Sequence, residues 1–135
     1  MPVFGERSEK NLGEAHPTLQ DLFNRVVRVY DCAVIEGYRG KEEQDRAFDK
    51  GHSQLRFPQS KHNRWPAEAV DVVPWHADAP HIRWNDRETM YHFAGVVRGV
   101  AIALGYDIRW GGDWDGDYNI HDQTFFDLVH FEIVT

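Results

Sequence analysis

Apolar positions recur at helical spacing in two stretches of the chain. After Pro17, five apolar residues at intervals of one, three or four predict a helix over about 17–30. These residues are Leu19, Leu22, Phe23, Val26 and Tyr30. Further along, Asn85 as N-cap with Glu88 three residues later forms a capping box, and the apolar face that follows predicts a long helix ending at Gly105.

Four short β-prone runs bounded by turn residues predict strands. They cover residues 32–38, 69–75, 106–110 and 128–134. A polar helix over 41–50, ended by Gly51, and an irregular loop over 52–66 follow the first run. This order predicts a single α+β domain over 1–135, with a small, mostly antiparallel sheet and helices on one side.

Composition narrows the classes of partner. Fifteen Lys and Arg residues against 22 Asp and Glu residues give a net charge of -7, which argues against binding to nucleic acid or to an anionic membrane. The one cysteine, Cys32, cannot form an internal disulfide, so the fold suits a reducing compartment. The first ten residues contain no apolar run, so we expect no signal peptide, no membrane insertion and synthesis in the cytoplasm. We also expect a monomer.

The residue types available for metal binding are histidine and carboxylates, because eight His residues accompany a single Cys. His62, Asp71 and His130 could form a zinc site, in which two neutral imidazoles and one carboxylate leave a fourth position for water. Each of these residues taken alone is more often a satisfied polar group or a cap. The spacing alone therefore leaves both interpretations open.

Four ordered motifs, spread from about residue 35 to the C-terminus, resemble one enzyme family. They are Gly37-Tyr38-Arg39 with Gln44, Ser60-x-His62 leading to Ala69-x-Asp71, Trp110-Gly-Gly-Asp-Trp114, and Asp127-x-x-His130-Phe131-Glu132. Together they resemble the zinc peptidases that cut peptidoglycan stem peptides. That family includes D-alanyl-D-alanine carboxypeptidases, vancomycin-resistance dipeptidases and the L-alanyl-D-glutamate endopeptidases of bacteriophage lysis systems. The resemblance implies the hedgehog-type zinc fold that these peptidases share.

The resemblance also implies roles for individual residues. It makes His62, Asp71 and His130 the ligands of one Zn²⁺ and makes Asp127 the general base. Many relatives have Glu at the position of Asp127, and the Asp form is similar to the phage endolysin branch, which favours the L-alanyl-D-glutamate bond. The interval between His62 and Asp71 is longer than in the family pattern, so the loop between them is remodelled. Because residues three apart on a straight strand face opposite sides, we expect the last strand to begin after Asp127.

Four further residues have both a functional and an ordinary interpretation. Arg39 could stabilise the oxyanion or bind a substrate carboxylate, or be a surface residue at a strand end. Gln44 could reach the substrate or lie on a helix surface. Ser60 could be a turn residue or a hydrogen-bond partner of a ligand. Glu132 could orient His130, contact the substrate or be solvated.

An acidic segment before Asp127 carries oxygen ligands at alternate positions, as calcium loops do. The residues are Asp113, Asp115, Asp117, Asn119 and Asp122. An EF-hand loop starting at Asp113 is excluded, because Tyr118 and Thr124 stand where it requires Gly and Glu. A looser regulatory Ca²⁺ site and a set of solvated carboxylates both remain open.

Four of the five tryptophans are interpreted as core or rim residues. They are Trp75, Trp84, Trp110 and Trp114. For Trp110 and Trp114, which flank a Gly-Gly turn, a place in the substrate groove is the alternative.

The leading hypothesis is a zinc-dependent, phage-type endolysin that hydrolyses the L-alanyl-D-glutamate bond of the peptidoglycan stem peptide. Such an enzyme would wait in the host cytoplasm until a holin-type pore releases it to the cell wall. A D-alanyl-D-alanine carboxypeptidase is the alternative within the family. A non-catalytic zinc-binding module of the hedgehog type is the alternative from another class, and the absence of repeats disfavours a wall-binding domain.

Overall fold

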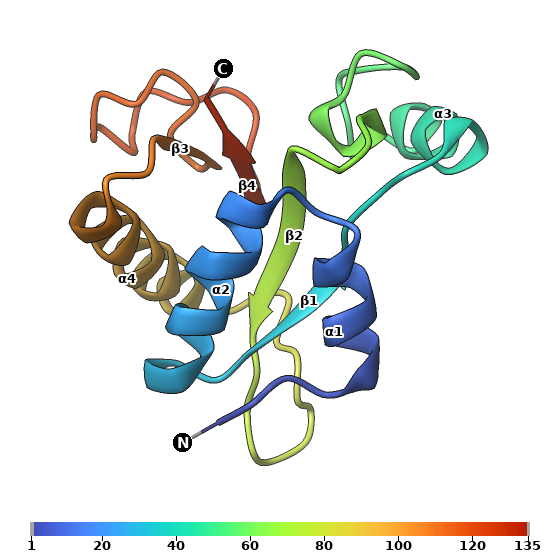
Figure 1. The fold of residues 1–135 in the computed structure, drawn as a ribbon. Coiled ribbons are helices and arrows are strands. Elements are labelled where there is room, and N and C mark those ends of the chain that lie inside the picture. Colours follow the sequence, from blue (N-terminus) through green and yellow to red (C-terminus); the bar gives the residue numbers. More distant parts are fainter. Residues whose placement is uncertain (1, 135) are drawn as a thin grey trace.

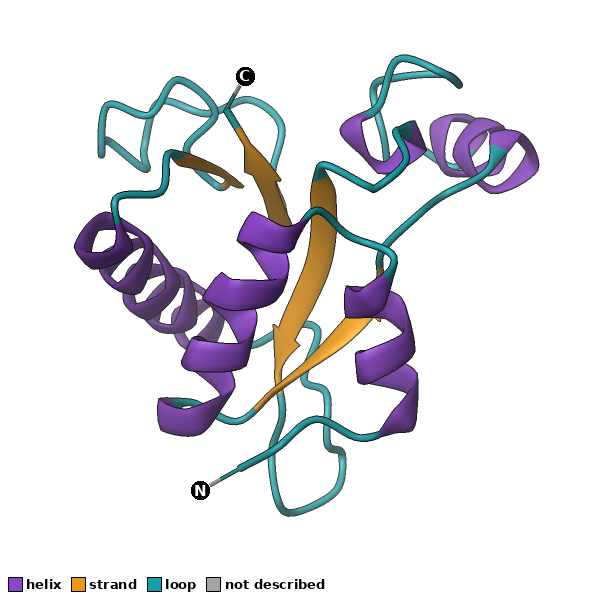
Figure 2. Ribbon diagram, in the orientation of Figure 1, coloured by secondary structure: helices purple, strands orange, loops and turns teal. Residues whose placement is uncertain are grey.

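The computed structural model describes residues 2–134, which form a four-stranded sheet with helices packed against it and one further helix, Lys41–Asp49, beyond its end (Figures 1 and 2). Along the chain the elements are α1 (Glu6–Gly13), α2 (Pro17–Val29), β1 (Cys32–Glu36), α3 (Lys41–Asp49), the 3-10 turn η1 (Lys61–Asn63), β2 (Ala69–Pro74), α4 (Arg87–Leu104), β3 (Ile108–Gly111) and β4 (Asp127–Ile133). The predicted α+β class is confirmed. Each predicted strand is present with ends shifted by one or two residues. Within the described residues, none of the helices has the length and apolar character needed to span a bilayer.

The sheet has the strand order β1-β2-β4-β3, and each neighbouring pair is antiparallel. The C-terminal strand β4 therefore lies between β2 and β3, although 52 residues separate the end of β2 from its start. The C-terminal strand β4, which has seven residues, thus pairs with β2, the strand that follows the 52–66 loop. Residues that are distant in sequence meet in this way at the centre of the sheet.

The hydrophobic core lies between one face of the sheet and the helices. The Phe131 ring of β4 packs edge-on against Phe23 of α2 and Phe93 of α4, with centroid distances of 5.4 and 6.1 Å. Val70 and Val72 of β2 belong to the same buried cluster. Because side chains alternate along a strand, the residues between these core positions point to the opposite face. That face is where the polar residues of β2 and β4 gather.

Helix α1 has no counterpart in the elements predicted from the sequence. It is a polar helix, and its contacts with β1 are largely hydrogen bonds rather than an apolar stripe. Ser8 Oγ accepts from the backbone N–H of Val34 at 3.0 Å, and Asn11 Nδ2 donates to the Val34 carbonyl at 2.9 Å. Hydrophobic periodicity could not reveal such a helix, because Leu12 is its one buried apolar residue.

The long helix α4 begins one residue later than predicted. Asp86, not Asn85, is the N-cap, and its carboxylate accepts from the backbone N–H of Thr89 at 3.1 Å and from the Thr89 hydroxyl at 2.7 Å. Both residues are good N-caps, and the Thr hydroxyl gives Asp86 a second bond. The predicted end is confirmed, because Gly105 adopts the left-handed conformation at the C-terminus with φ of 79°.

Candidate metal centre and active site

His62 is held in place by a short turn at the end of the irregular loop. Ser60 caps the 3-10 turn η1: its hydroxyl accepts from the backbone N–H of His62 at 3.2 Å, and its own N–H donates to Asn63 Oδ1 at 3.1 Å. The His62 ring is buried, and its Nδ1 lies 2.8 Å from the carbonyl of Gly37. A proton on Nδ1 satisfies that carbonyl, so Nε2 is left with a lone pair facing Asp71.

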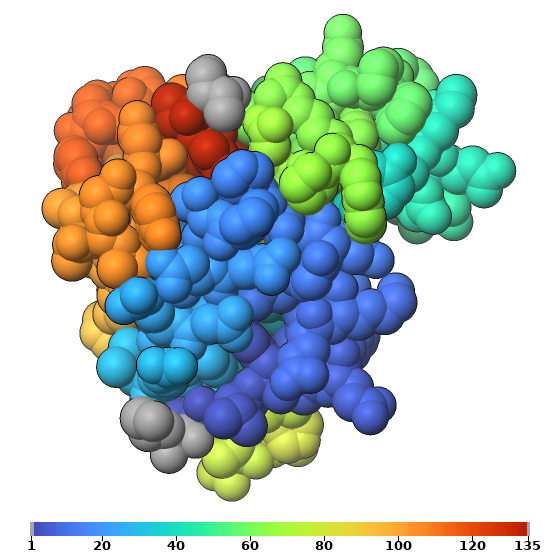
Figure 3. Space-filling model, in the orientation of Figure 1, coloured from blue at the N-terminus to red at the C-terminus, as the bar shows by residue number. Residues whose placement is uncertain are grey.

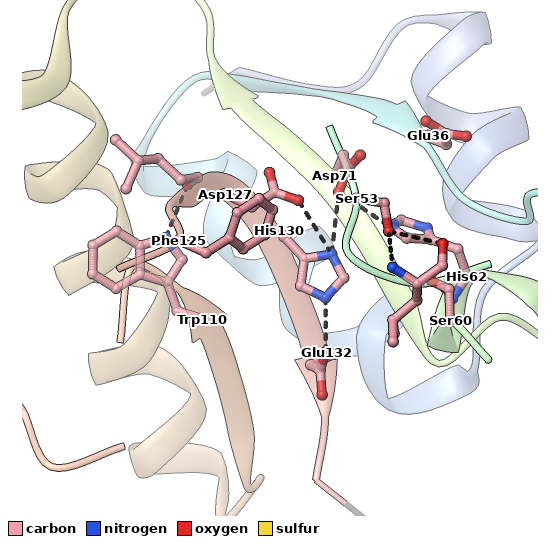
Figure 4. Close-up of polar contacts among 12 residues, drawn as sticks. Glu36, Ser53, Ser60, His62, Asp71, Trp110, Phe125, Asp127, His130 and Glu132 are labelled. Atoms are coloured by element: carbon pink, nitrogen blue, oxygen red, sulfur yellow. Dashed lines mark hydrogen bonds and ion pairs between the residues drawn. The ribbon is translucent and has the colours of Figure 1, made fainter. Parts of the chain in front are cut away.

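Asp71 and His130 meet through the pairing of the two central strands. They are directly opposite each other in the β2–β4 register, so their side chains share the face that the helices leave free. Asp71 Oδ1 lies 3.5 Å from His130 Nδ1 and 3.1 Å from His62 Nε2 (Figure 4). The three predicted ligands, which come from a loop and two strands, are thus brought together.

Glu132 orients His130. Its Oε1 lies 2.8 Å from His130 Nε2 (Figure 4). Its other carboxylate oxygen lies 3.3 Å from Lys61 Nζ and 3.2 Å from Arg109 Nη1. A proton on Nε2 donates to Glu132 and leaves Nδ1 free for a metal. Of the interpretations offered for Glu132, the geometry favours the orientation of His130.

The three donors suit a zinc ion. One ligand atom from each of His62, Asp71 and His130 lies within 4.8 Å of the other two, and all three residues are buried. Ligands about 2.0–2.1 Å from a tetrahedral Zn²⁺ are separated by roughly 3.3 Å, which is close to the 3.1 and 3.5 Å observed. Both imidazoles also have an acceptor on the second ring nitrogen, as metal-binding histidines usually do.

Asp127 lies beside this group, although it stands three positions before His130 in the chain. Its Oδ2 is 3.9 Å from His130 Nδ1 (Figure 4). The prediction that β4 begins after Asp127 is wrong: Asp127 is the first residue of the strand and pairs with Gly111. The register shifts between Trp110 and Gly111, so the strand is not straight here and the alternation of faces is broken. A Cβ on Gly111 would lie 2.0 Å from the Asp127 carbonyl, so this close approach requires glycine.

The pKa values of the two carboxyl groups move in opposite directions. Burial raises the pKa of Asp127 to about 6, and the negative charge of Asp71 adds to the effect. For Asp71, burial acts in the same direction, but the charges and hydrogen bonds of His62 and His130 outweigh it and hold its pKa well below the usual range. Asp71 is therefore the permanent anion, and Asp127 is the group able to exchange a proton near neutral pH.

The two carboxylates that contact the His130 ring, those of Asp71 and Glu132, shift its pKa. Burial lowers the pKa of His130, but the hydrogen bonds to Asp71 and Glu132 outweigh it and raise that pKa to about 9. A metal ion binds neutral imidazole, so its binding at Nδ1 has to release a proton.

Arg39 is held in the site by three side chains. Its guanidinium donates to both carboxylate oxygens of Glu36, at 2.7 and 3.1 Å, to Gln44 Oε1 at 2.9 Å, and to Asp71 Oδ2 at 3.4 Å. The interpretation of Gln44 as a helix surface residue is wrong, since it is fully buried and its Nε2 donates to the Leu55 carbonyl at 2.6 Å. Gln44 thus links Arg39 to the loop that carries His62.

The two tryptophans that flank the Gly-Gly turn have different surroundings, and each matches one of the two interpretations offered for them. Trp110 is a core residue, as expected, and its indole donates to the Leu128 carbonyl at 2.8 Å. Trp114, in contrast, lines the hollow above the site, with its ring centroid 5.3 Å from that of His130 and stacked on Phe125 at 6.0 Å. The Gly-Gly turn thus lies between the buried ring of Trp110 and the ring of Trp114, which lies at the site.

The acidic segment forms a second cluster. Asp113, Asp115 and Asp117 each place a carboxylate oxygen within 4.8 Å of the other two. Asp113 is buried: one of its oxygens accepts from Arg98 at 2.8 Å, whereas Oδ1 has no hydrogen-bond partner among the described residues. Asp122 lies outside this cluster, and its carboxylate bonds to the neighbouring Gln123. The Asn119 oxygen accepts from the backbone N–H of His121 at 3.0 Å.

The residues that sequence reasoning missed are the partners of the predicted ones. Glu36 anchors Arg39, and Lys61 and Arg109 anchor Glu132. No motif distinguishes these charged residues from solvated ones. Glu36 ends a predicted strand next to the Gly37-Tyr38-Arg39 motif, and this position was the one available signal.

Comparison with known proteins identifies the family of this chain. Residues 2–134 match the family described as phage L-alanyl-D-glutamate peptidase. The L-alanyl-D-glutamate peptidase of Escherichia phage T5 is 29% identical over 136 residues, which cover 97% of both chains. The crystal structure of the Serratia marcescens L-Ala D-Glu endopeptidase ChiX superposes with a TM-score of 0.76 and 29% identity, covering 98% of this chain and 90% of ChiX. The match over nearly the whole chain places this protein in the phage L-alanyl-D-glutamate peptidase family, a family of peptidoglycan peptidases.

Proposed function

We propose that this protein is a zinc-dependent endopeptidase that hydrolyses the L-alanyl-D-glutamate bond of the peptidoglycan stem peptide. The observation that carries the proposal is the convergence of His62 Nε2, Asp71 Oδ1 and His130 Nδ1 on one buried point, with both imidazoles oriented by hydrogen bonds. Family membership supports the assignment of the scissile bond, and the two imidazoles and one carboxylate support the assignment of zinc as the metal.

His62, Asp71 and His130 would hold the Zn²⁺. When bound there, zinc would lower the pKa of a water molecule from 15.7 toward about 7 and polarise the scissile carbonyl. Asp127 faces the same point and accepts one proton from the attacking water. As the C–N bond breaks, Asp127 gives that proton to the leaving nitrogen of D-glutamate, and the second proton of the water passes from the new carboxylic acid to the amine, so the products are a carboxylate and an ammonium group.

Arg39 would stabilise negative charge that develops on the carbonyl oxygen. Its guanidinium keeps its charge: burial lowers the pKa of Arg39, but the hydrogen bond to Glu36 and the charges of nearby carboxylates together outweigh burial and raise that pKa. Its bonds to Glu36 and Gln44 fix its orientation before the substrate binds, which is the arrangement that favours electrostatic stabilisation of a transition state.

We also propose that Asp113, Asp115 and Asp117 bind a regulatory Ca²⁺. The unpartnered Asp113 Oδ1 supports this proposal, since a buried carboxylate oxygen without a donor is costly unless a cation satisfies it. Trp114 lies between Asp113 and Asp115 in sequence and reaches His130. A cation that orders this segment would therefore act on the wall of the catalytic site.

In the cell, we propose the role of a phage-type endolysin. The enzyme would act as a monomer, remain in the host cytoplasm during infection, and reach the cell wall when a holin-type pore opens. Cleavage of the stem peptide would then weaken the wall and cause lysis.

Purified Gram-negative sacculi test the proposal. The enzyme is treated with a chelator, assayed with and without added zinc, and the fragments are identified by mass. Zinc-restored release of peptides with N-terminal D-glutamate is the expected result. Release of free D-alanine would instead support a D-alanyl-D-alanine carboxypeptidase, and bound zinc without any cleavage would support a non-catalytic zinc module.

A further inference from the structure

The catalytic residues lie between two hollows that share Arg39, Phe125 and Asp127. The first hollow, of about 310 Å³, also contains His62 and His130. The second hollow, of about 500 Å³, lies on the other side of the three shared residues. In the space-filling view, the two segments that border the site, coloured green and orange-red, lie at the same end of the molecule (Figure 3). A peptide chain crossing the site would occupy both hollows.

The two hollows carry opposite charge. The first, which we call the basic hollow, is lined by three basic and two acidic residues: Arg39, Lys61, Arg64, Asp127 and Glu132. The second, which we call the acidic hollow, is lined by one basic and four acidic residues: Arg39, Glu36, Glu43, Asp71 and Asp127. The protein has a net charge of -7, yet basic side chains gather on one side of the catalytic residues. The two ends of a substrate that spans both hollows would therefore meet different electrostatic potentials.

The stem peptide has a matching asymmetry. D-Glutamate is joined to the next residue through its γ-carboxyl group, so its α-carboxylate remains free beside the scissile bond, and more carboxylates follow. On the other side, L-alanine is joined by an amide to the lactyl group of a muramic sugar, and this end is uncharged. Electrostatic complementarity therefore favours the D-glutamate end in the basic hollow.

Arg64 is the cation available to that carboxylate. Lys61 is 15% exposed and bound to Glu132 and to the Ile133 carbonyl, so it is already engaged. Arg64 is 48% exposed, and its one ion pair, to Glu68 at 2.6 Å, is at the surface. Exposed pairs of this kind contribute little, so the guanidinium can exchange Glu68 for a substrate carboxylate at small cost.

The acidic hollow offers aromatic surface instead. Trp84 is 57% exposed and Phe126 is 38% exposed, and both line this hollow beside Asp127. Aromatic faces pack well against the C–H faces of a sugar ring, and an uncharged ring is not repelled by nearby carboxylates. Of the two interpretations offered for Trp84, this exposure excludes a core residue and fits a residue at the rim of the site.

We propose that the substrate lies across the site in one direction, with the α-carboxylate of D-glutamate bound by Arg64 in the basic hollow and the muramic sugar packed on Trp84 and Phe126 in the acidic hollow. The inference rests on the proposed peptidase function and assigns the substrate's two ends to the two hollows.

The first arm of the test uses two synthetic muropeptides that differ at one group, the free α-carboxylate of D-glutamate or its carboxamide. Arg64→Gln should lower kcat/KM about ten-fold on the carboxylate substrate, the loss expected for a charge-assisted hydrogen bond, and less than about two-fold on the amide. Arg25→Gln is the matched control. Arg25 is similarly exposed, at 54% against 48% for Arg64, and it also pairs with a carboxylate four residues away, but it lies on α2 and lines neither hollow.

The second arm compares a substrate that carries the sugar with an N-acetylated peptide that lacks it. Trp84→Ala should lower kcat/KM about ten-fold on the sugar-bearing substrate and leave the sugar-free peptide nearly unchanged. Trp65→Ala is the control, because Trp65 is 70% exposed and lines neither hollow.

The outcomes separate the inference from the function on which it rests. Suppose that the wild-type enzyme cleaves the substrates but a variant loses the same factor in kcat/KM on both substrates of its pair. That result overturns the assigned direction. If instead the loss of kcat/KM in Trp84→Ala depends on the α-carboxylate and the loss in Arg64→Gln depends on the sugar, the substrate lies in the opposite direction. If the zinc-loaded wild type cleaves none of the substrates at the L-alanyl-D-glutamate bond, the proposed function fails, and the inference fails with it.

Discussion

The two clusters of metal-ligating side chains within residues 2–134 are built in different ways. His62, Asp71 and His130 are all buried, two of them stand on paired central strands, and each imidazole has a fixed acceptor on its second nitrogen. In the acidic cluster, Asp113 is buried but Asp115 and Asp117 are exposed on a connecting segment. A site built into the sheet is pre-organised for tight binding, whereas a site on a loop can be ordered by the ion itself, which suits regulation.

The largest effect is expected from removing a ligand of the first cluster. His62→Ala should abolish stoichiometric zinc binding and lower the rate of wall lysis about 10⁴-fold, because the metal supplies several kcal/mol of transition-state stabilisation. Metal analysis and turbidity assays of permeabilised cells measure both quantities. A variant that retains one zinc per chain would show that His62 is not a ligand.

A smaller loss is expected for the proton carrier. Asp127→Asn should keep zinc and fold but lower kcat about 10³-fold, within the range for loss of a general acid–base group. Steady-state kinetics on a defined muropeptide, with zinc content measured in the same sample, provide the check. Wild-type turnover in this variant would remove Asp127 from the proposed mechanism.

The fixed acceptors can be tested separately from the ligands. Glu132→Gln should weaken zinc binding by 10–100-fold, the usual cost of losing the carboxylate behind a metal-binding histidine. Competition with a chromophoric chelator measures the affinity, and Glu88→Gln on the exposed start of α4 is the matched control. Equal affinities for the two variants would mean that Glu132 does not support His130.

The smallest effect belongs to the loop cluster. Calcium at about 100 times its dissociation constant should stabilise the fold by about 2.7 kcal/mol and so raise Tm by roughly 10 °C. The double variant Asp115→Asn/Asp117→Asn should lose this shift while keeping the wild-type affinity for zinc. If the variant retained the calcium shift, the cluster would not be the site; if it lost zinc, the two clusters would not be independent.

The sequence predicted the parts of the fold that depend on apolar periodicity and on turn residues. The helix after Pro17, the long helix ending at Gly105 and the four strands all follow from these patterns. Helix α1 could not be predicted in this way, because Ser8 and Asn11 attach it to the sheet through polar bonds.

For the site, the motifs predicted which side chains gather but not how they are held. The ordered motifs identified His62, Asp71 and His130, and the β2–β4 register explains why two of them meet. The irregular strand at Asp127 was missed, because a register shift depends on how two distant segments pair. The burial of Gln44 was missed for the same reason, since it depends on a loop eleven residues further along the chain.

Helix α1 also protects an exposed boundary of the sheet. β1 is an edge strand, so one row of its backbone groups faces away from β2 and could pair with a strand from another molecule. Ser8 and Asn11 occupy the N–H and the carbonyl of Val34, which are two of those groups. A chain shortened by its first dozen residues would uncover this edge, and the expected consequence is aggregation through strand addition.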